Sequence, residues 1–381
     1  MMKSKNKVSV LVLNDLITDS RVIKESTSLS KKFTVEVFCF GYLGTNHDYH
    51  ELNKQYNFGI NRVVQYNRTL TGIRKKLNQF SAFILYVLNT FKHLRSSDII
   101  HCNDLETLPI GVLHKIIRPR IKVIYDAHEY ETETMWMRNL FKKKTAKLLE
   151  KILLKYVDRL IVVSNSIGIA YVNDYGLNLT PTTIYNLPNK KEKLIPISLK
   201  EKIGIPNSST LYLFQGGLTN GRGIKLILEA FKKNVSTSHV LFMGSGYFER
   251  EVKEISKTHK NIHYLQSVPQ NQLIAHTTSA DFGILSYENT CKNHDYAAPN
   301  KLFEYLMAGI PILASPLSEI QKFITDKDVG KVYENYSTES IHSACVYLEK
   351  NKDSFTKNIN HIRLDYSWEA QENLFLSIYD I

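Results

Sequence analysis

The stretch Leu211-Tyr-Leu-Phe-Gln-Gly-Gly-Leu-Thr-Asn-Gly-Arg-Gly223 joins an apolar run, a glycine-rich turn and a helical pattern that extends from Ile224 to about Lys233. A short run that is apolar throughout is typical of a parallel strand buried on both faces. A strand, a glycine-rich turn and a helix in this order form the first part of a βαβ unit. The amides of such a turn and the helix dipole favour a bound phosphate, although a plain tight βα turn has the same pattern.

The same alternation of short apolar runs and longer helical patterns extends over most of the chain. We expect strands at 8–14, 33–40, 99–102, 121–125, 160–163 and 182–185, and then at 211–215, 240–243, 262–265, 282–285, 311–314 and 331–333. Between the two series, three prolines and a basic cluster indicate a linker.

The sequence therefore predicts an α/β protein with two doubly wound, Rossmann-like parallel sheets that face a cleft. We place the N-terminal domain at 1–186, the linker at 187–208 and the C-terminal domain at 209–364. Ligands of open α/β sheets bind at the carboxyl ends of the strands, so the residues that follow each strand are the candidates for a site.

The composition is that of a globular protein, with 43% apolar and 23% charged residues in 381. The four cysteines lie far apart, which favours unpaired thiols in a reducing compartment. The start lacks a signal-peptide pattern, and the longest apolar run is far shorter than the ~20 residues that span a bilayer. We expect a cytoplasmic protein.

The net charge of +12 lies entirely in the first part of the chain. Residues 1–160 contain 27 Lys and Arg against 15 Asp and Glu, whereas residues 161–381 contain 22 of each kind. Helical patterns at 73–95 and 138–159 combine basic and apolar residues, which suits either an anionic membrane surface or packing on a sheet. We expect peripheral contact with an anionic membrane, with a merely solubilising surface as the alternative. We expect no nucleic-acid partner, because the basic segments form no recognisable binding module.

A second stretch, Tyr296-Ala-Ala-Pro-Asn-Lys-Leu-Phe-Glu-Tyr-Leu-Met-Ala-Gly-Ile-Pro311, predicts a helix that begins near Asn300 and ends at Gly309. Its first turn offers backbone amides and Lys301, which suit a diphosphate. Glu304, one turn further, can accept hydrogen bonds from ribose hydroxyls. An ordinary surface helix with a solvated lysine and glutamate would have the same sequence.

From Pro299 to Pro311 this stretch resembles the donor-binding signature of the family 4 retaining glycosyltransferases, which have the GT-B fold. Six further segments resemble the same family in matching order, at 19–25, 100–109, 125–129, 163–165, 185–189 and 366–369. The resemblance implies a nucleotide-diphosphate sugar as donor substrate and retention at the anomeric carbon. It also implies a last helix, at 365–381, that returns to the N-terminal domain.

The resemblance assigns residues to a site. It implies catalytic roles for His128 and Glu304, with a satisfied structural histidine as the alternative for His128. The implied donor-binding residues are Gly216, Gly217, Arg222, Tyr296, Asn300, Lys301, Leu302 and Glu304. On the acceptor side we expect Asp15, Arg21, Asp104 and Glu106, with helix capping as the alternative for Asp104.

Two positions depart from the family pattern. The family carries a glutamate eight positions before Glu304, where this chain has Tyr296, and the adjoining Asp295 is the alternative replacement. The phosphate-binding arginine of the family is replaced by Gly217, while its nearby lysine corresponds to Arg222.

We expect no metal and no cofactor. The Asp326-Lys-Asp328 segment follows a helix and predicts a surface turn, whereas a metal-dependent transferase needs such carboxylates at a strand end. The residues and the family resemblance together predict a metal-independent glycosyltransferase whose acceptor is a glycan or a lipid-linked glycan, as in bacterial surface polysaccharide assembly. Retention is implied by the resemblance alone. The alternatives are a nucleotide-sugar epimerase and a non-catalytic glycan-binding subunit of the same fold.

Overall fold

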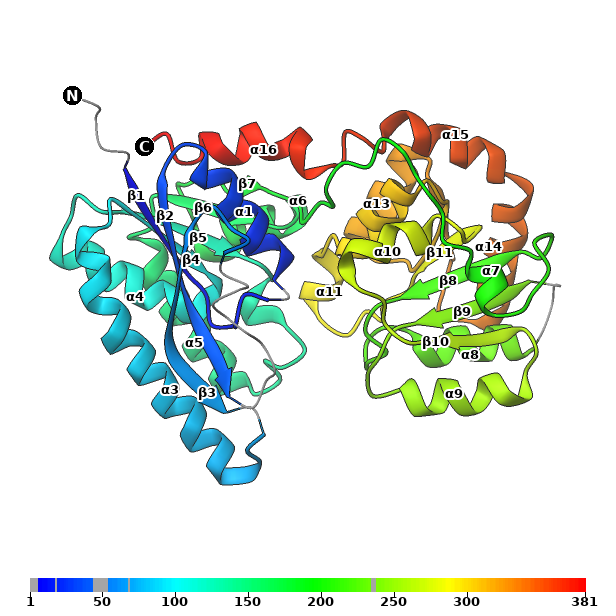
Figure 1. The fold of residues 1–381 in the computed structure, drawn as a ribbon, viewed down its shortest axis with the longest axis horizontal. Coiled ribbons are helices and arrows are strands. Elements are labelled where there is room, and N and C mark those ends of the chain that lie inside the picture. Colours follow the sequence, from blue (N-terminus) through cyan, green and yellow to red (C-terminus); the bar gives the residue numbers. More distant parts are fainter. Residues whose placement is uncertain (1–5, 18, 44–53, 68, 234–237) are drawn as a thin grey trace. The chain divides into compact units, whose positions relative to one another are not determined.

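The computed structural model describes residues 6–17, 19–43, 54–67, 69–233 and 238–381. The chain forms two compact units, each with its own sheet (Figure 1). The first unit comprises Met1–Ile184 and Glu372–Ile381, and the second comprises Tyr185–Gln371.

The first unit has a seven-stranded sheet in the order β3-β2-β1-β4-β5-β6-β7, with parallel pairing throughout its described strands. The strands are β1 Lys7–Leu11, β2 Thr34–Leu43, β3 Gly59–Asn67, β4 Ile99–Asn103, β5 Lys122–Ala127, β6 Arg159–Val162 and β7 Thr182–Thr183. The helices are α1 Ser20–Ser30, α3 Gly72–His93, η1 Leu94–Ser96, α4 Asp104–Ile117, η2 Glu131–Glu133, α5 Leu140–Leu154 and α6 Asn165–Tyr175.

One strand of this sheet, β3, was not predicted. It lies at the sheet edge, where β2 is its one partner among the described strands. Its sequence places Asn61, Arg62 and Gln65 among apolar residues, so it lacks the continuous apolar run of the central strands. An edge strand is only partly covered and tolerates such residues, which is why a search for buried parallel strands misses it.

The second unit has a six-stranded parallel sheet in the order β10-β9-β8-β11-β12-β13. The strands are β8 Leu211–Gln215, β9 His239–Met243, β10 Ile262–Leu265, β11 Phe282–Leu285, β12 Ile312–Ala314 and β13 Gly330–Val332. The helices are α7 Leu199–Lys202, α8 Ile224–Lys232, α9 Glu249–Thr258, α10 Gln270–Thr277, α11 Lys292–Tyr296, α12 Asn300–Ala308, α13 Ser318–Lys327, α14 Thr338–Lys350 and α15 Lys352–Ile362.

Strand β8 explains why the apolar runs have no alternation. Leu211 and Leu213 belong to one buried cluster, while Tyr212 and Phe214 belong to another. Successive side chains of a strand point to opposite faces, so the two clusters lie on the two faces of the sheet. Both faces are buried beneath helices, as the sequence predicted for doubly wound sheets.

The C-terminal segment returns to the first unit, as expected. It contains the end of α16, which spans Trp368–Ser377. The hydroxyl of Ser28 donates to Glu372 Oε1 at 2.5 Å, and Lys31 Nζ lies 2.5 Å from the same oxygen. Tyr379 is buried, and its hydroxyl lies 2.5 Å from His101 Nδ1.

Among the described residues, no helix is both long enough and apolar enough to cross a bilayer.

Candidate active site

The glycine-rich turn after β8 packs closely against its neighbours. Gly216 has a φ of +99°, and a side chain there would place its Cβ 2.9 Å from Lys301 Cε. Directly after the next strand, β9, a Cβ on Gly244 would lie 1.9 Å from the Gly216 carbonyl oxygen. Glycine is required at both positions because any side chain would separate these backbones or displace the lysine.

Lys301 lies in the first turn of α12 and has an unusual environment. Its Nζ atom is shielded from solvent, and among the described residues none accepts a hydrogen bond from it. The ammonium lies 4.1 Å from the centroid of the Phe214 ring and 5.7 Å from that of Tyr287. Burial and the nearby Arg222 guanidinium lower the pKa of Lys301 to about 7. A buried ammonium without a hydrogen-bond partner is costly, so an anion that pairs with it would be strongly favoured.

Arg222 provides a second cation at the same place. Its guanidinium carbon lies 4.3 Å from the centroid of the Tyr287 ring, so this ring contacts both cations. Cation–π contacts hold each charge in position without neutralising it. The two cations and the backbone amides of the glycine-rich turn are therefore suited to bind a doubly charged anion such as a diphosphate.

Glu304 follows Lys301 by one turn and is fixed by a residue that the sequence analysis did not select. Gln215, the last residue of β8, is 1% exposed and donates from Nε2 to Glu304 Oε2 at 2.7 Å. Its Oε1 accepts from Thr277 Oγ1 at 2.7 Å, which sets the orientation of the amide. The available signal was a glutamine at the end of a strand that is otherwise apolar.

The remaining predicted donor residues have different surroundings. Asn300 is exposed at the start of α12, and Tyr296 is half-buried at the end of α11. Leu302 is buried in the core of the unit, and its amide donates to the Pro299 carbonyl at 2.9 Å. We therefore assign Leu302 to packing of α12 on the sheet. A side chain on Gly217 would have room, since its Cβ would come no closer than 3.8 Å to Thr219.

Asp295 is engaged elsewhere. Its Oδ1 accepts from the backbone amide and from the hydroxyl of Ser318, both at 2.9 Å. These bonds satisfy donors at the start of α13, as a capping carboxylate does. Asp295 is thus a poor replacement for the missing glutamate, and Tyr296 remains at that position.

In the first unit, His128 lies beyond the end of β5 between two carboxylates. Its Nε2 is 3.0 Å from Asn103 Oδ1 and 3.4 Å from Asp126 Oδ2, while its Nδ1 is 3.6 Å from Asp104 Oδ1. Burial opposes the positive charge, but Asp104 and Asp126 together raise the pKa of His128 to about 10. His128 is therefore an imidazolium at neutral pH and is suited to donate hydrogen bonds.

Asp104 has a strained backbone beside this histidine. Its φ of +62° is in the left-handed region, which a residue with a side chain rarely adopts. The residue begins α4 directly after β4, so the strain turns the chain at the carboxyl edge of the sheet. Strain of this kind gathers at functional sites, which agrees with a role for Asp104 beyond helix capping.

Arg21, which we expected on the acceptor side, is buried inside the first unit. It is 3% exposed and donates to both oxygens of Asp126 at 2.8–3.0 Å, and its Nη1 donates to the Ile184 carbonyl at 2.9 Å. Burial alone would raise the pKa of Asp126, but Arg21 and His128 hold it well below its usual value. The basic residue at this position thus neutralises a buried carboxylate.

Within the described chain, Glu25, His101 and Asp126 are the carboxylate and imidazole groups close enough together to share a metal ion. Arg21 Nε already lies 3.0 Å from both Glu25 Oε1 and Asp126 Oδ2. The guanidinium supplies the positive charge that a metal would bring, so these residues fit a metal poorly.

The Asp326-Lys-Asp328 segment lies at the end of α13. Asp328 directly follows the helix, and its side chain accepts a hydrogen bond from Asn358 Nδ2 at 2.8 Å.

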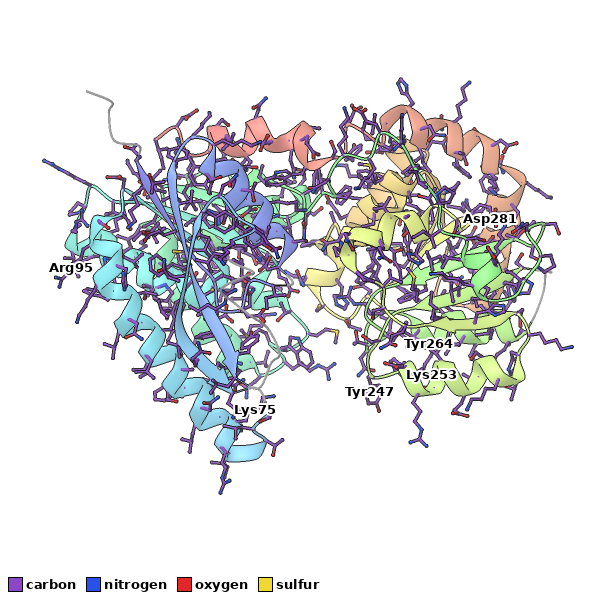
Figure 2. All side chains as sticks on the ribbon, viewed as in Figure 1. Lys75, Arg95, Tyr247, Lys253, Tyr264 and Asp281 are labelled. Atoms are coloured by element: carbon purple, nitrogen blue, oxygen red, sulfur yellow. The ribbon has the colours of Figure 1, made fainter. Side chains whose placement is uncertain are left out.

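The other two residues predicted on the acceptor side, Asp15 and Glu106, differ in their exposure to solvent. Asp15 is buried, and its Oδ1 accepts from the Ile17 amide within its own loop. Glu106 is exposed and lines a pocket of about 520 Å³ between the strand ends and α3. Figure 2 labels Lys75, near the start of α3, which lines the same pocket. The other lining residues are mostly aromatic or apolar, namely Leu13, Phe40, Tyr42, Tyr66, Gln79, Ala82 and Phe83.

Two family models match the chain, one in each unit. Residues 22–188 match the model described as Glycosyltransferase Family 4, and residues 227–352 match that of the Glucosyltransferase 3-like, C-terminal domain. The first unit thus belongs to glycosyltransferase family 4. The chain is a glycosyltransferase, as its sequence predicted.

Solved structures share the fold over nearly the whole chain. Sucrose-phosphate synthase from Thermosynechococcus elongatus is 14% identical, with a TM-score of 0.77 over 99% of this chain and 98% of that chain. HepE from Anabaena, in complex with UDP and glucose, is 13% identical, with a TM-score of 0.71 over 98% of this chain and 99% of that chain. WaaG, a glycosyltransferase involved in lipopolysaccharide biosynthesis, is 14% identical, with a TM-score of 0.61 over 97% of this chain and 99% of that chain. At these identities the likeness establishes the GT-B fold. A search of curated protein sequences finds no match to this chain.

The low pKa of Lys301 predicts that this glycosyltransferase takes up a proton when it binds a diphosphate. With a pKa of about 7, Lys301 is mostly neutral at pH 8, and a bound anion raises that pKa. Calorimetry with UDP at pH 8, in buffers of different ionisation enthalpy, should report uptake approaching one proton. Lys301→Met should lose this uptake, and an unchanged uptake in that variant would contradict the assignment.

Glu304 should contribute to binding of the ribose and little to binding of the phosphates. Glu304→Ala should weaken UDP binding by about 1–3 kcal/mol, the cost of leaving polar partners unpaired. Inorganic pyrophosphate, which has no ribose, should bind the variant nearly as well as it binds the wild type. Glu304→Gln retains an acceptor for Gln215 and serves as the control for local structure. Equal losses for both ligands in calorimetry would argue against a ribose contact.

Proposed function

We propose that this glycosyltransferase moves a sugar from a nucleotide-diphosphate sugar to a glycan or lipid-linked glycan, with retention and without a metal. The observation that carries the proposal is the pair of cations on Tyr287. The Nζ atom of one of them, Lys301, is shielded from solvent and has no hydrogen-bond partner among the described residues. The structure of HepE contains UDP and glucose, which supports a UDP-sugar as the donor.

Departure of the diphosphate is the step that the second unit would assist. Negative charge develops on the bridging oxygen as the glycosidic bond breaks, and fixed cations stabilise that charge. Lys301 and Arg222 are held by aromatic rings before any ligand arrives, so little reorganisation is needed. They would thus take the part that a divalent metal takes in metal-dependent transferases. Glu304, oriented by Gln215, would hold the ribose.

In the first unit, His128 would act in the transfer step as a hydrogen-bond donor. With a pKa of about 10 it is already protonated at neutral pH and cannot accept a proton, so it would stabilise charge and orient hydroxyls. Asp126 is paired with both Arg21 and His128, which leaves it unsuited to attack the sugar. We infer retention by attack of the acceptor on the same face from which the diphosphate leaves, in keeping with the family.

A turnover assay tests the proposal. Purified protein, UDP-sugars and a glycan or lipid-linked acceptor should release UDP, and the release should persist in excess EDTA. Loss of turnover in EDTA that Mg²⁺ or Mn²⁺ restores would refute metal independence. Conversion of the donor alone into an isomeric nucleotide sugar would instead identify an epimerase. Glycan binding without turnover of any donor would indicate a binding subunit.

We further propose that the acceptor is reached at an anionic membrane, through a basic and apolar surface on α3 and α5. Helix α5 is built in an unusual way, since it buries a carboxylate and exposes apolar residues. Glu150 is fully buried and accepts hydrogen bonds from Tyr125, Tyr171 and Tyr175. The apolar residues that α5 exposes are Leu140, Phe141, Leu148, Leu149 and Ile152, and Phe141 is 78% exposed.

Helix α3, which is 22 residues long, also exposes apolar residues. It buries only Ala82, Tyr86 and Thr90, and exposes Ile73, Leu77, Phe80, Ile84, Leu85 and Leu88. Basic residues accompany it at both ends, as Lys75 and Arg95 illustrate (Figure 2). Exposed apolar patches bordered by lysine and arginine mark surfaces that bind anionic membranes. The related WaaG acts in lipopolysaccharide biosynthesis, which supports a lipid-linked acceptor.

Vesicle binding tests the membrane proposal. Lys142, Lys144 and Lys151 are exposed on α5, whereas Lys143 pairs with Glu133 at 2.6 Å and should be left unchanged. Changing the three exposed lysines to glutamate should greatly reduce co-sedimentation with phosphatidylglycerol vesicles, since each basic residue contributes about 1 kcal/mol. Binding of the wild type should weaken with salt.

The matched control changes three exposed lysines of the second unit, Lys260, Lys322 and Lys327, to glutamate. This control alters the net charge equally and should bind vesicles as the wild type does. If neither lipid charge nor the α5 changes affect the bound fraction, the basic surface serves another purpose and the membrane proposal fails.

A further inference from the structure

Two imidazoles share a single amide oxygen in the first unit. Asn103 Nδ2 donates to the Leu11 carbonyl at 2.9 Å, which fixes the orientation of the amide. Its Oδ1 then lies 3.0 Å from His128 Nε2 and 3.3 Å from His101 Nε2. A carbonyl oxygen only accepts, so both rings must carry a proton on Nε2.

The second nitrogen of His101 faces the C-terminal segment. Its Nδ1 lies 2.5 Å from the Tyr379 hydroxyl, and both residues are buried. With its proton on Nε2, a neutral His101 can only accept at Nδ1, so Tyr379 is the donor. Tyr379 thereby selects the tautomer that lets His101 donate to Asn103.

Two acidic side chains also lie near His101. Its carboxylate neighbours are Glu25 and Asp126, both at 3.7 Å from Nε2. Burial raises the pKa of Glu25 above its usual range, which favours its neutral form. The negative charge of Asp126 is matched by Arg21. At 3.7 Å both carboxylates are farther from Nε2 than Asn103 Oδ1 at 3.3 Å, so the amide oxygen is the acceptor that Nε2 faces.

We propose that Tyr379, His101 and Asn103 are positioning residues that orient His128 so that it presents its Nδ1–H to the reacting sugar. On that edge Asp104 is 3.6 Å away, an ion-pair distance that is too long for a hydrogen bond. A substrate hydroxyl could therefore take this proton as a hydrogen-bond acceptor. The inference rests on the proposed role of His128 in transfer.

This network also includes the places where the chain passes between the two units. Arg21, which holds Asp126, donates to the carbonyl of Ile184, the last residue of the first unit before the linker. The chain returns to the first unit between Gln371 and Glu372, and Tyr379 lies seven residues after Glu372. The end of the chain thus contributes directly to the support of His128, and its role goes beyond covering the core.

Removal of one hydroxyl tests the inference. Tyr379→Phe should reduce kcat about 10- to 100-fold, the range observed when a residue that orients a functional ligand is lost, with the KM for the donor unchanged. Tyr86→Phe is the matched control, because that buried hydroxyl donates to the Phe38 carbonyl at 2.8 Å and contacts neither imidazole. If kcat falls no more in Tyr379→Phe than in Tyr86→Phe, the inference is wrong.

Nitrogen-15 NMR of the histidine rings gives a readout that a purely structural role would not change. In the wild type His101 should be protonated on Nε2, and in Tyr379→Phe this preference should be lost. An unchanged tautomer would overturn the inference even if activity falls. Asn103→Ala, which removes the shared acceptor, should lower kcat as Tyr379→Phe does, and normal turnover by this variant would equally count against it.

His128→Ala separates this inference from the proposed function. If that variant retains near-normal kcat, the role of His128 in transfer is wrong and the inference fails with it. If His128→Ala loses activity while Tyr379→Phe and Asn103→Ala keep theirs, only the positioning inference fails. Nucleotide affinity should stay near that of the wild type in all three variants.

Discussion

A lysine ammonium buried among aromatic rings is the constraint around which the second unit is organised. An ion removed from water without an opposite charge costs several kcal/mol, and lowering its pKa relieves only part of that cost. Lys301 is retained at such a place by the fold itself, because Gly216 leaves room for its side chain and Phe214 contacts its charge. A plain tight turn between a strand and a helix would need none of these features.

The two units treat buried charge in opposite ways. In the first, Arg21 and Asp126 neutralise each other, with oxygens and nitrogens at hydrogen-bond distance. Such a pair gives a defined arrangement of α1, β5 and the residues beyond, and it has no need of a ligand. In the second, Arg222 and Lys301 repel each other, and the repulsion contributes to the low pKa of the lysine. A charge that the protein leaves unmatched is the stronger indication of a binding site.

Much of the architecture could be predicted from the sequence, because central parallel strands are apolar on both faces and glycine-rich turns follow them. Strand β3 could not, since an edge strand with Asn61 and Gln65 has no such run. The type of a single charged residue does not tell whether its side chain lies on the surface or in the interior. Arg21 was assigned to the acceptor side, but its partner Asp126 lies 105 positions away, and only the folded chain brings them together. Gln215 and Tyr379 were missed for the same reason, as their roles depend on distant residues.

The proposed function thus depends on a preformed site for a nucleoside diphosphate at Lys301 in the second unit. The most direct test is a thermal-shift screen of nucleosides, nucleoside monophosphates and nucleoside diphosphates against the wild type and Lys301→Met. Since a ligand stabilises the folded state by mass action, diphosphates should raise the melting temperature of the wild type far more than monophosphates do. In Lys301→Met this preference should disappear. An equal preference for diphosphates in both proteins would contradict the account.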